Sequence, residues 1–295
     1  MNTNMLLRSF MFLPAYNSKF IDKALCSNAD ALILDMEDAV PPEKRQSSRD
    51  NIIQYHNNGA FHQKNIFIRI NEIGTKDFSE DIMQLILPDI TGLMPSKIMN
   101  AEDIIFLDKL LNVMELKKNI DVGTIKLAPL IETTKAVMDV QRIAQSSKRL
   151  VALCFGGEDY LNDLGSTYTY QETAFIFPRA IIVNAARSAG LLPIDTPYLN
   201  VMDIEGFEKK ECEAYKNGFA GCLLLNPRQI EPANRVFSPD AKKIEYSKKV
   251  IEAVNLVTSE KKSGVVMLDG VMVGPPMRKR AQSVLEQNKL INLKK

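Results

Sequence analysis

Histidine is scarce in this chain of 295 residues, which contains only His56 and His62. Both lie in a polar stretch that we interpret as the end of a helix and the loop after it, where surface histidines are common. A Ser-His-Asp triad and a zinc site with histidine ligands are therefore nearly excluded. Any catalysis must come from aspartate, glutamate, arginine, lysine or backbone amides.

Cysteine is also rare, and its four copies form no Cys-x-x-Cys pair. The spacing of Cys26, Cys154, Cys212 and Cys222 fits neither a zinc site nor a disulfide framework, so we expect reduced thiols and a cytoplasmic protein. No apolar run approaches about 20 residues, the length that spans a bilayer. Residues 1–13 lack a small-residue cleavage site and lead directly into a strand, so we expect no signal peptide.

Neither sign of charge is in excess. Lysine and arginine total 37, aspartate and glutamate total 36, and the net charge is +1. A balance this close to zero argues against a partner that is nucleic acid or a membrane surface. With 45% hydrophobic and 25% charged residues, the composition is that of an ordinary globular protein. The length allows one large domain or two ordinary ones.

Two stretches place acids directly after buried strands. The apolar run at 150–155 is typical of a strand buried on both faces of a parallel sheet. Two glycines end this run, and Glu158 and Asp159 follow. Residues 125–132 repeat the form and end in Glu132. If the two strands are neighbours, Glu132 and Asp159 lie side by side, and paired hard oxygen ligands are typical of Mg²⁺ sites.

The whole chain repeats this strand–helix form. Eight such units occupy about 230 residues, which predicts an α/β fold, a (β/α)₈ TIM barrel. The alternative is a doubly wound sheet, although it rarely needs eight units this regular. After Asp159 we expect a polar loop up to residue 170. The predicted strands are residues 9–13, 31–34, 65–71, 92–97, 125–132, 150–155, 192–196 and 222–225.

We predict two domains. The catalytic barrel comprises residues 1–236, and a C-terminal helical extension at 237–295 contains a helix, a short strand and a helix. No Gly-x-Gly-x-x-Gly follows the first strand, and no P-loop sequence occurs, so dinucleotide and P-loop functions are disfavoured.

Polar groups follow almost every predicted strand. The carboxyl ends of barrel strands share one face, so these groups are expected to meet at one mouth. Any one of them alone is as readily a helix cap as a functional group. Their convergence predicts an active site. The set is Asp35, Glu37, Asp38, Arg69, Asn71, Lys97, Glu132, Glu158, Asp159, Asp195, Asn226 and Arg228.

Seven motifs resemble, in order, those of the beta subunit of citrate lyase and its stand-alone relatives. These relatives are the malyl-, citramalyl- and citryl-thioester lyases of the HpcH/HpaI aldolase superfamily. The resemblance covers almost the whole chain. It implies a Mg²⁺-dependent lyase, usually a homotrimer, whose C-terminal extension packs on a neighbouring subunit. Its partners would be a 2-oxo acid and an acyl thioester of CoA or of an acyl carrier protein. The motifs lie at residues 8–14, 35–40, 69–71, 131–132, 157–160, 195–196 and 226–230.

The resemblance assigns the metal and substrate sites to four residues. Glu132 and Asp159 match the metal ligands and also contact the substrate. Arg69 matches the clamp for a substrate carboxylate, a task that suits bidentate guanidinium geometry. Backbone amides near Gly157 would donate to the bound oxo acid. From the residues alone, two helix-capping acids and a structural ion pair of Arg69 remain alternatives.

The resemblance implies that the catalytic residues are Arg69, Glu37 and Asp38. Glu37 and Asp38 match groups that hold Arg69 and metal-bound water. Mg²⁺ on the 2-oxo acid portion would polarise its oxygen and stabilise developing negative charge. Lys97 is a weaker candidate, for a Schiff base with a carbonyl substrate, since a solvated or ion-paired lysine is the commoner role.

Three positions depart from the family pattern. Gly274 stands where the family has an Asp, a candidate proton carrier to the thioester carbon. Cys222 replaces a Lys, and Ala174 replaces a Glu, although Gln171 and Glu172 are nearby. Three hypotheses follow. They are a Mg²⁺-dependent thioester lyase, a Mg²⁺-dependent aldolase on a free 2-oxo acid, and a catalytically impaired subunit that binds an oxo acid or a partner.

Overall fold

The computed structural model describes residues 5–167, 172–259 and 265–294. Within these ranges nine parallel strands form one sheet, in the order β5-β4-β3-β2-β1-β9-β8-β7-β6. The strands are β1 (Ser9–Pro14), β2 (Ala31–Asp35), β3 (Asn65–Ile70), β4 (Gly92–Pro95), β5 (Lys126–Leu127), β6 (Leu130–Ile131), β7 (Ala152–Phe155), β8 (Leu192–Asp195) and β9 (Gly221–Leu224).

The sheet closes into a barrel because β5 and β6, at its two ends, are consecutive halves of one interrupted strand. β5 pairs with β4, β6 pairs with β7, and only Ala128 and Pro129 separate the halves. Backbone bonds cross this junction, from Leu127 N to Arg149 O at 2.9 Å and from Cys154 N to Pro129 O at 3.0 Å. Proline has no N–H to donate, which explains the interrupted ladder. The predicted eight-strand barrel is confirmed, with its fifth strand split.

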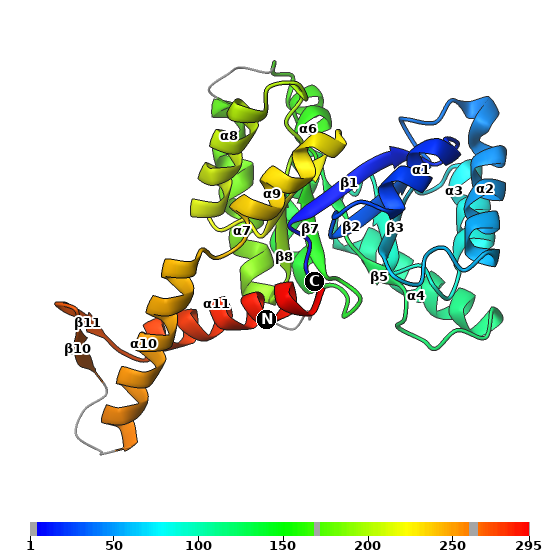
Figure 1. The fold of residues 1–295 in the computed structure, drawn as a ribbon. Helices are drawn as coiled ribbons and strands as arrows, with labels where there is room; N and C mark the ends of the chain where they lie inside the picture. The colour runs from blue at the N-terminus through cyan, green and yellow to red at the C-terminus, as the bar shows by residue number, and fades with distance from the viewer. Residues whose placement is uncertain (1–4, 168–171, 260–264, 295) are drawn as a thin grey trace.

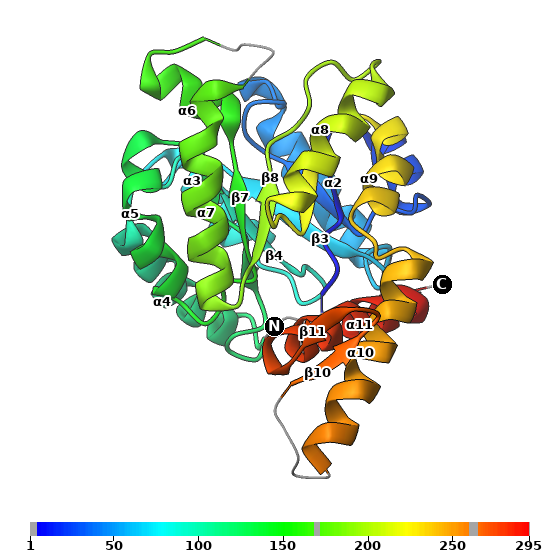
Figure 2. The same cartoon turned by 90° about the vertical axis from the view of Figure 1, so that its left-hand side faces the viewer.

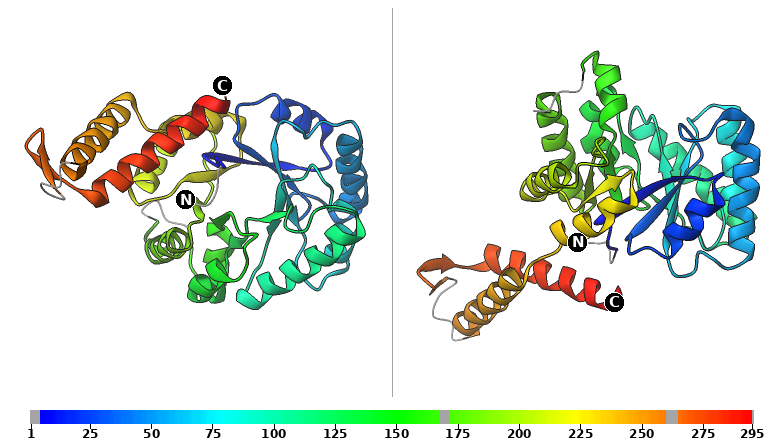
Figure 3. Two further views of the ribbon diagram at one scale, coloured as in Figure 1. Left: turned by 90° about the horizontal axis from the view of Figure 1, so that it is seen from below. Right: turned by 45° about the horizontal axis from the view of Figure 1, so that its top comes forward.

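Helices cover the outside of the barrel (Figures 1 and 3). Short 3₁₀ turns at Pro42–Lys44, Thr173–Phe175 and Pro227–Gln229 precede three of them. The helices are α1 (Ser18–Leu25), α2 (Arg45–Asn57), α3 (Lys76–Leu85), α4 (Ala101–Lys117), α5 (Thr134–Gln145), α6 (Gly157–Leu164), α7 (Ile176–Ala189), α8 (Ile204–Lys216) and α9 (Ile230–Val236).

Apolar side chains alternate between the barrel interior and the layer beneath the helices. In β2, Ala31 and Ile33 belong to the interior cluster, whereas Leu32 and Leu34 belong to the cluster packed under the helices. This is the two-residue period of a strand. Because both faces are buried, the strands read as continuous apolar runs in the sequence.

The prediction of a polar loop after Asp159 is wrong over its first part. Gly157 begins α6, which ends at Leu164 and is capped by Gly165 with a left-handed φ of 71°. Glu158 and Asp159 occupy the first turn of this helix, where the helix dipole favours negative charge. The two glycines end the strand, as expected, but the second of them also starts a helix.

The C-terminal extension contains α10 (Ala241–Ser259), a hairpin of β10 (Val266–Leu268) and β11 (Val271–Val273), and α11 (Pro275–Lys294). The sequence predicted one strand here, and the structure has two. Asp269 and Gly270 have φ values of 47° and 78° and form the two-residue turn between antiparallel strands. The aspartate–glycine pair was the signal for this hairpin.

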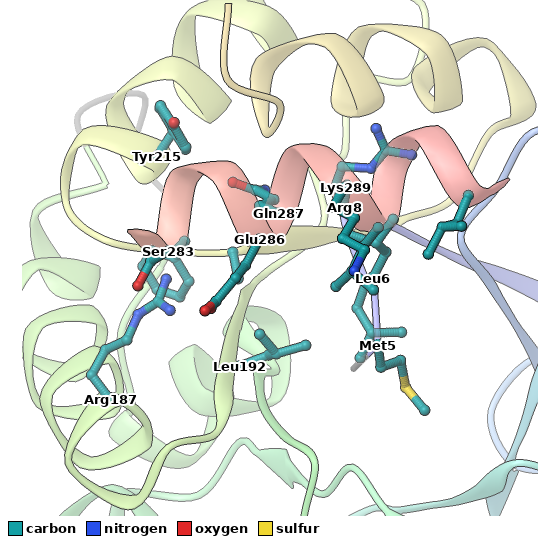
Figure 4. Close-up of a pocket in the computed structure, with 15 residues that line it drawn as sticks. Met5, Leu6, Arg8, Arg187, Leu192, Tyr215, Ser283, Glu286, Gln287 and Lys289 are labelled. Carbon is teal, nitrogen blue, oxygen red and sulfur yellow. The ribbon is translucent and has the colours of Figure 1, made fainter. Parts of the chain in front are cut away.

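Helix α11 returns beneath the barrel after α10 has run away from it (Figures 1 and 2). Near its end, Lys294 Nζ lies 2.5 Å from Asp30 Oδ1. A pocket of about 410 Å³ separates α11 from the underside of the barrel, and Arg187 and Glu286 are among its lining residues (Figure 4). None of the helices in the described ranges is both long enough and apolar enough to cross a lipid bilayer.

Candidate active site

A cleft of about 370 Å³ lies at the mouth of the barrel, where the strands end. Five of the six predicted site residues line this cleft: Asp38, Arg69, Glu132, Gly157 and Asp159. The sixth, Glu37, is buried beside them and contacts Arg69. The topology therefore gathers all six residues at one place, although they come from four separate strand–helix connections.

Arg69 is held by three carboxylates. The register of β2 and β3 places Asp35 opposite Arg69, and Asp35 accepts from Nε at 2.7 Å and from Nη2 at 2.6 Å. Nη1 lies 3.2 Å from both Glu37 Oε2 and Asp38 Oδ2. The ring of Phe12 lies 5.1 Å from the guanidinium carbon. Burial acts to lower the pKa of Arg69, but the hydrogen bonds to Asp35 and the negative charges of Asp35, Glu37 and Asp38 together raise it.

This arrangement limits how Arg69 can meet a substrate. Asp35 occupies the Nε–Nη2 edge, so a carboxylate can bind bidentately only at the Nη1–Nη2 edge. There the competing partners are the buried Glu37 and Asp38, whose side chain is 55% exposed and can move away. Sequence reasoning named Glu37 and Asp38 as the groups that hold Arg69 and missed Asp35. The sequence did contain a signal for this contact, because an acid and an arginine stand at the ends of two consecutive predicted strands.

Glu132 is 2% exposed and follows β6. Its Oε1 accepts from the backbone N–H of Lys97 at 2.5 Å. Lys97 has a φ of 51°, a left-handed conformation that is unfavourable for a non-glycine residue. Its ammonium group lies 3.0 Å from Glu37 Oε1. This pairing raises the pKa of Lys97, so the amine stays protonated and is unsuited to a Schiff base.

The surroundings of the Glu132 carboxyl group favour a bound cation. Burial raises its pKa to about 8, and the negative charge of Asp159 adds to the rise, while the Lys97 N–H opposes it. A Cβ at Gly156 would stand 2.6 Å from Glu132 Oε2, so the glycine leaves that oxygen room. In the described part of the chain, no three or more His, Cys, Asp or Glu residues form a metal-binding group. Two carboxylates with water and substrate are nevertheless a suitable Mg²⁺ site.

Asp159 and Gly157 are both in the first turn of α6. The Gly157 N–H donates to Thr196 Oγ1 at 2.9 Å, so this amide is already engaged. A Cβ at Gly157 would stand 2.7 Å from the same oxygen and 2.8 Å from the Phe175 ring. Gly157 thus shapes the cleft by its lack of a side chain. The other N–H groups of the first helical turn have no intrahelical partner and favour an anion nearby.

Other polar residues at the strand ends serve the fold. Asn71 donates to Asp81 Oδ2 at 2.7 Å and to the Met36 carbonyl at 3.1 Å. Asn226 caps the turn after β9 by accepting from Arg228 N at 3.0 Å. The wider set predicted at the mouth was therefore too inclusive, because a buried polar side chain there can equally satisfy backbone groups.

Residues 8–227 match the family model described as HpcH/HpaI aldolase/citrate lyase. The chain belongs to this family. Citrate lyase subunit beta of Leuconostoc mesenteroides subsp. cremoris is 31% identical over 97% of this chain and 94% of its own length. The L-malyl-CoA/beta-methylmalyl-CoA lyase of Rhodobacter capsulatus is 27% identical over 95% of this chain and 94% of its own.

Among solved structures, the protein CitE from Mycobacterium tuberculosis in complex with magnesium, acetoacetate and coenzyme A is similar over 97% of this chain and 100% of that chain. The TM-score is 0.75 and the sequence identity is 23%. At this identity the likeness shows a shared fold. It agrees with the barrel architecture that the strand pairing establishes.

At one departure from the HpcH/HpaI pattern, a neighbouring residue supplies the missing charge. Ala174 stands where the family has a glutamate. Glu172, two residues earlier, pairs with Arg179 Nη1, and Arg179 Nε donates to Asp195 Oδ1 at 2.9 Å. Gln171, the other nearby candidate, lies outside the described residues. Arg179 therefore keeps an acidic partner from the segment that precedes its helix.

At a second departure, a lysine from another element supplies the missing positive charge. Cys222 replaces a lysine in β9, and its register partner in β8 is Asp195. Lys210, from α8, brings its ammonium group within 3.2 Å of Asp195 Oδ2. At the third departure, Gly274 is buried, whereas Asp269, the acid nearest to it in the sequence before the motif, is exposed at the hairpin turn.

Proposed function

We propose that this chain is a Mg²⁺-dependent carbon–carbon lyase acting on a 3-hydroxyacyl thioester such as citryl-, malyl- or citramalyl-CoA. Cleavage would give a 2-oxo acid and an acetyl thioester, and the reverse reaction would join them. The observation that carries the proposal is that Glu132, Asp159 and Arg69 line one cleft at the barrel mouth. Family membership supports it, as does the magnesium, acetoacetate and coenzyme A in the CitE structure.

Glu132 and Asp159 would hold the Mg²⁺ ion. When bound, the ion supplies a Lewis acid that polarises the oxo group and stabilises negative charge. The protein prepares this site by burying Glu132 and by placing Asp159 close enough to raise the pKa of Glu132. A buried carboxylate beside a half-buried one is unfavourable alone and favourable around a divalent cation.

Arg69 would orient the substrate. Its Nη1–Nη2 edge would bind the carboxylate of the oxo acid in place of Asp38, and Asp35 keeps the guanidinium group fixed, so the reacting bond stays aligned. Glu37 and Asp38 would hold Arg69 and order water in the cleft. Burial raises the pKa of Glu37, partly offset by Arg69, which suits a group that exchanges protons with that water.

The test is incubation of the purified protein with Mg²⁺, acetyl-CoA and one of oxaloacetate, glyoxylate or pyruvate. Condensation should convert acetyl-CoA and one of these acids to a 3-hydroxyacyl-CoA, and removal of Mg²⁺ by a chelator should stop it. Glu132→Gln should abolish turnover, whereas Glu102→Gln, a change at an exposed carboxylate that does not line the cleft, should not. Absence of acetyl-CoA consumption with all three acids would refute the proposal.

Gly274 favours a second candidate function. Without an acid at this position, the thioester half of the reaction lacks a candidate proton carrier, and the oxo-acid half is unaffected. The chain would then be a Mg²⁺-dependent aldolase on a free 2-oxo acid, or a subunit that binds an oxo acid without turnover. Reaction of oxo acids without CoA identifies the first, and calorimetric binding without turnover identifies the second. Thioester consumption that appears only in Gly274→Asp would favour the impaired subunit.

We also propose that the chain is a homo-oligomer, with a trimer as the expected form, in which residues 237–295 pack on a neighbouring subunit. The hairpin presents Met267, Val271 and Met272, which are 60%, 48% and 65% exposed. Apolar groups gathered on a projecting hairpin favour a protein partner. Analytical ultracentrifugation should show the oligomer, and Met267→Glu/Met272→Glu should dissociate it, while Gln282→Glu on α11 should not. A monomeric wild-type protein would contradict this proposal.

A further inference from the structure

A buried cluster of charges lies behind the cleft, between β8, α7 and α8. We call it the Lys210 network. It contains three acids and two bases, and none of their side chains is more than 17% exposed. Burying this many ionisable groups is unfavourable unless their geometry is fixed. The metal and substrate sites proposed above do not use them. The members are Glu172, Arg179, Asp195, Lys210 and Glu211.

Lys210 connects this network to the cleft. Its ammonium group lies 2.9 Å from Glu211 Oε1 and 3.2 Å from Asp195 Oδ2, and it donates to the Thr196 carbonyl at 2.6 Å. Thr196 follows β8 and lines the cleft. The Thr196 hydroxyl accepts the Gly157 N–H at 2.9 Å. Lys210 therefore fixes Thr196, and Thr196 in turn binds the first residue of α6.

We infer that Lys210 is a positioning residue for the active site. It fixes Thr196, which fixes the first turn of α6 and with it the Asp159 carboxylate. An ammonium group suits this task because it donates to one carbonyl and one carboxylate, and its charge is balanced by a second carboxylate, Asp195 Oδ2, at 3.2 Å. The fit at the next contact is close, since a Cβ at Gly157 would stand 2.7 Å from Thr196 Oγ1. The role of Asp159 rests on the proposed function, whereas the chain of contacts does not.

The test removes the ammonium group and monitors α6 directly in the full-length protein. In Lys210→Met, amide hydrogen exchange at Gly157 should be about tenfold faster, because its acceptor is no longer fixed. The KM for the oxo acid should rise by about tenfold with a smaller change in kcat, as expected for misplaced binding groups. The matched control is Lys209→Met, which alters the adjacent, exposed lysine and should change neither quantity.

A second variant guards against loss of the fold, because Lys210→Met leaves Asp195 and Glu211 without their ammonium partner. In Lys210→Ala/Cys222→Lys the total side-chain volume is nearly conserved, and the new lysine starts from the register partner of Asp195. This restores the buried positive charge but leaves the Thr196 carbonyl without its donor. The same faster exchange and higher KM are therefore expected.

The inference is overturned if, in a variant that folds, the amide exchange rate at Gly157 and the KM for the oxo acid both stay within twofold of the wild-type values. Failure of both variants to fold assigns Lys210 to the fold alone and also overturns it. If the wild-type protein turns over neither thioester nor oxo acid, the proposed function fails. The exchange rate at Gly157 still decides the role of Lys210 in that case.

Discussion

The affinity of the protein for Mg²⁺ is expected to rise steeply between pH 6 and pH 8, because Glu132 must lose a proton before it can bind the ion. Burial raises the pKa of Glu132 to about 8, and Asp159 and Glu37 contribute to the rise. With this pKa, about 1% of the carboxyl groups are ionised at pH 6 and about half at pH 8. The association constant should therefore increase about 50-fold, equivalent to about 2.3 kcal/mol.

Titration calorimetry with Mg²⁺ at pH 6, 7 and 8 measures this change. Repeating each titration in two buffers with different enthalpies of ionisation gives the protons released on binding. About one is expected at pH 6 and about one half at pH 8. Glu132→Gln has no proton to release, so it should bind the ion weakly and equally at all three pH values. An affinity that changes less than about threefold in the wild-type protein would refute the reasoning.

Four further predictions concern Glu132, two residues beside it and one buried ion pair elsewhere in the barrel. Because the pKa of Glu132 is raised on folding, the metal-free protein should lose about 1.4 kcal/mol of stability per pH unit as pH rises from about 5 to 8, and urea unfolding should show a smaller loss in Glu132→Gln. Asp159→Asn should abolish Mg²⁺-dependent ligand binding with the circular dichroism unchanged, and unchanged calorimetric Mg²⁺ affinity would defeat its assignment as a ligand. Gly156→Ala should weaken Mg²⁺ binding by displacing the Glu132 carboxylate, and wild-type affinity there would exclude the steric argument. Glu115→Ala should cost about 3–5 kcal/mol in urea unfolding, because it removes a buried partner that accepts from Arg149 Nη1 at 2.8 Å, and a cost below about 1 kcal/mol would contradict this.

The order of elements in the barrel could be read from the sequence because it depends on local patterns. Strands buried on both faces must be continuously apolar, so runs such as 150–155 identify them without any knowledge of neighbours. Parallel strands place their carboxyl ends on one face, so Glu132 and Asp159 could be expected at one mouth. The same reasoning does not detect α6, because two glycines at 156–157 indicate a break more strongly than a helix start.

The sequence by itself thus determined the barrel and the residues that meet at its mouth. The tertiary structure alone decided the partners of each charge. Asp35 lies beside Arg69 because the register of β2 and β3 pairs the two residues. Lys210 contacts Thr196 because α8, the helix after β8, packs back against the end of that strand. The pKa of Glu132 also depends on burial and on charges from other strand–helix units. Apolar periodicity is a local property, whereas hydrogen bonds and desolvation depend on which distant groups packing brings together.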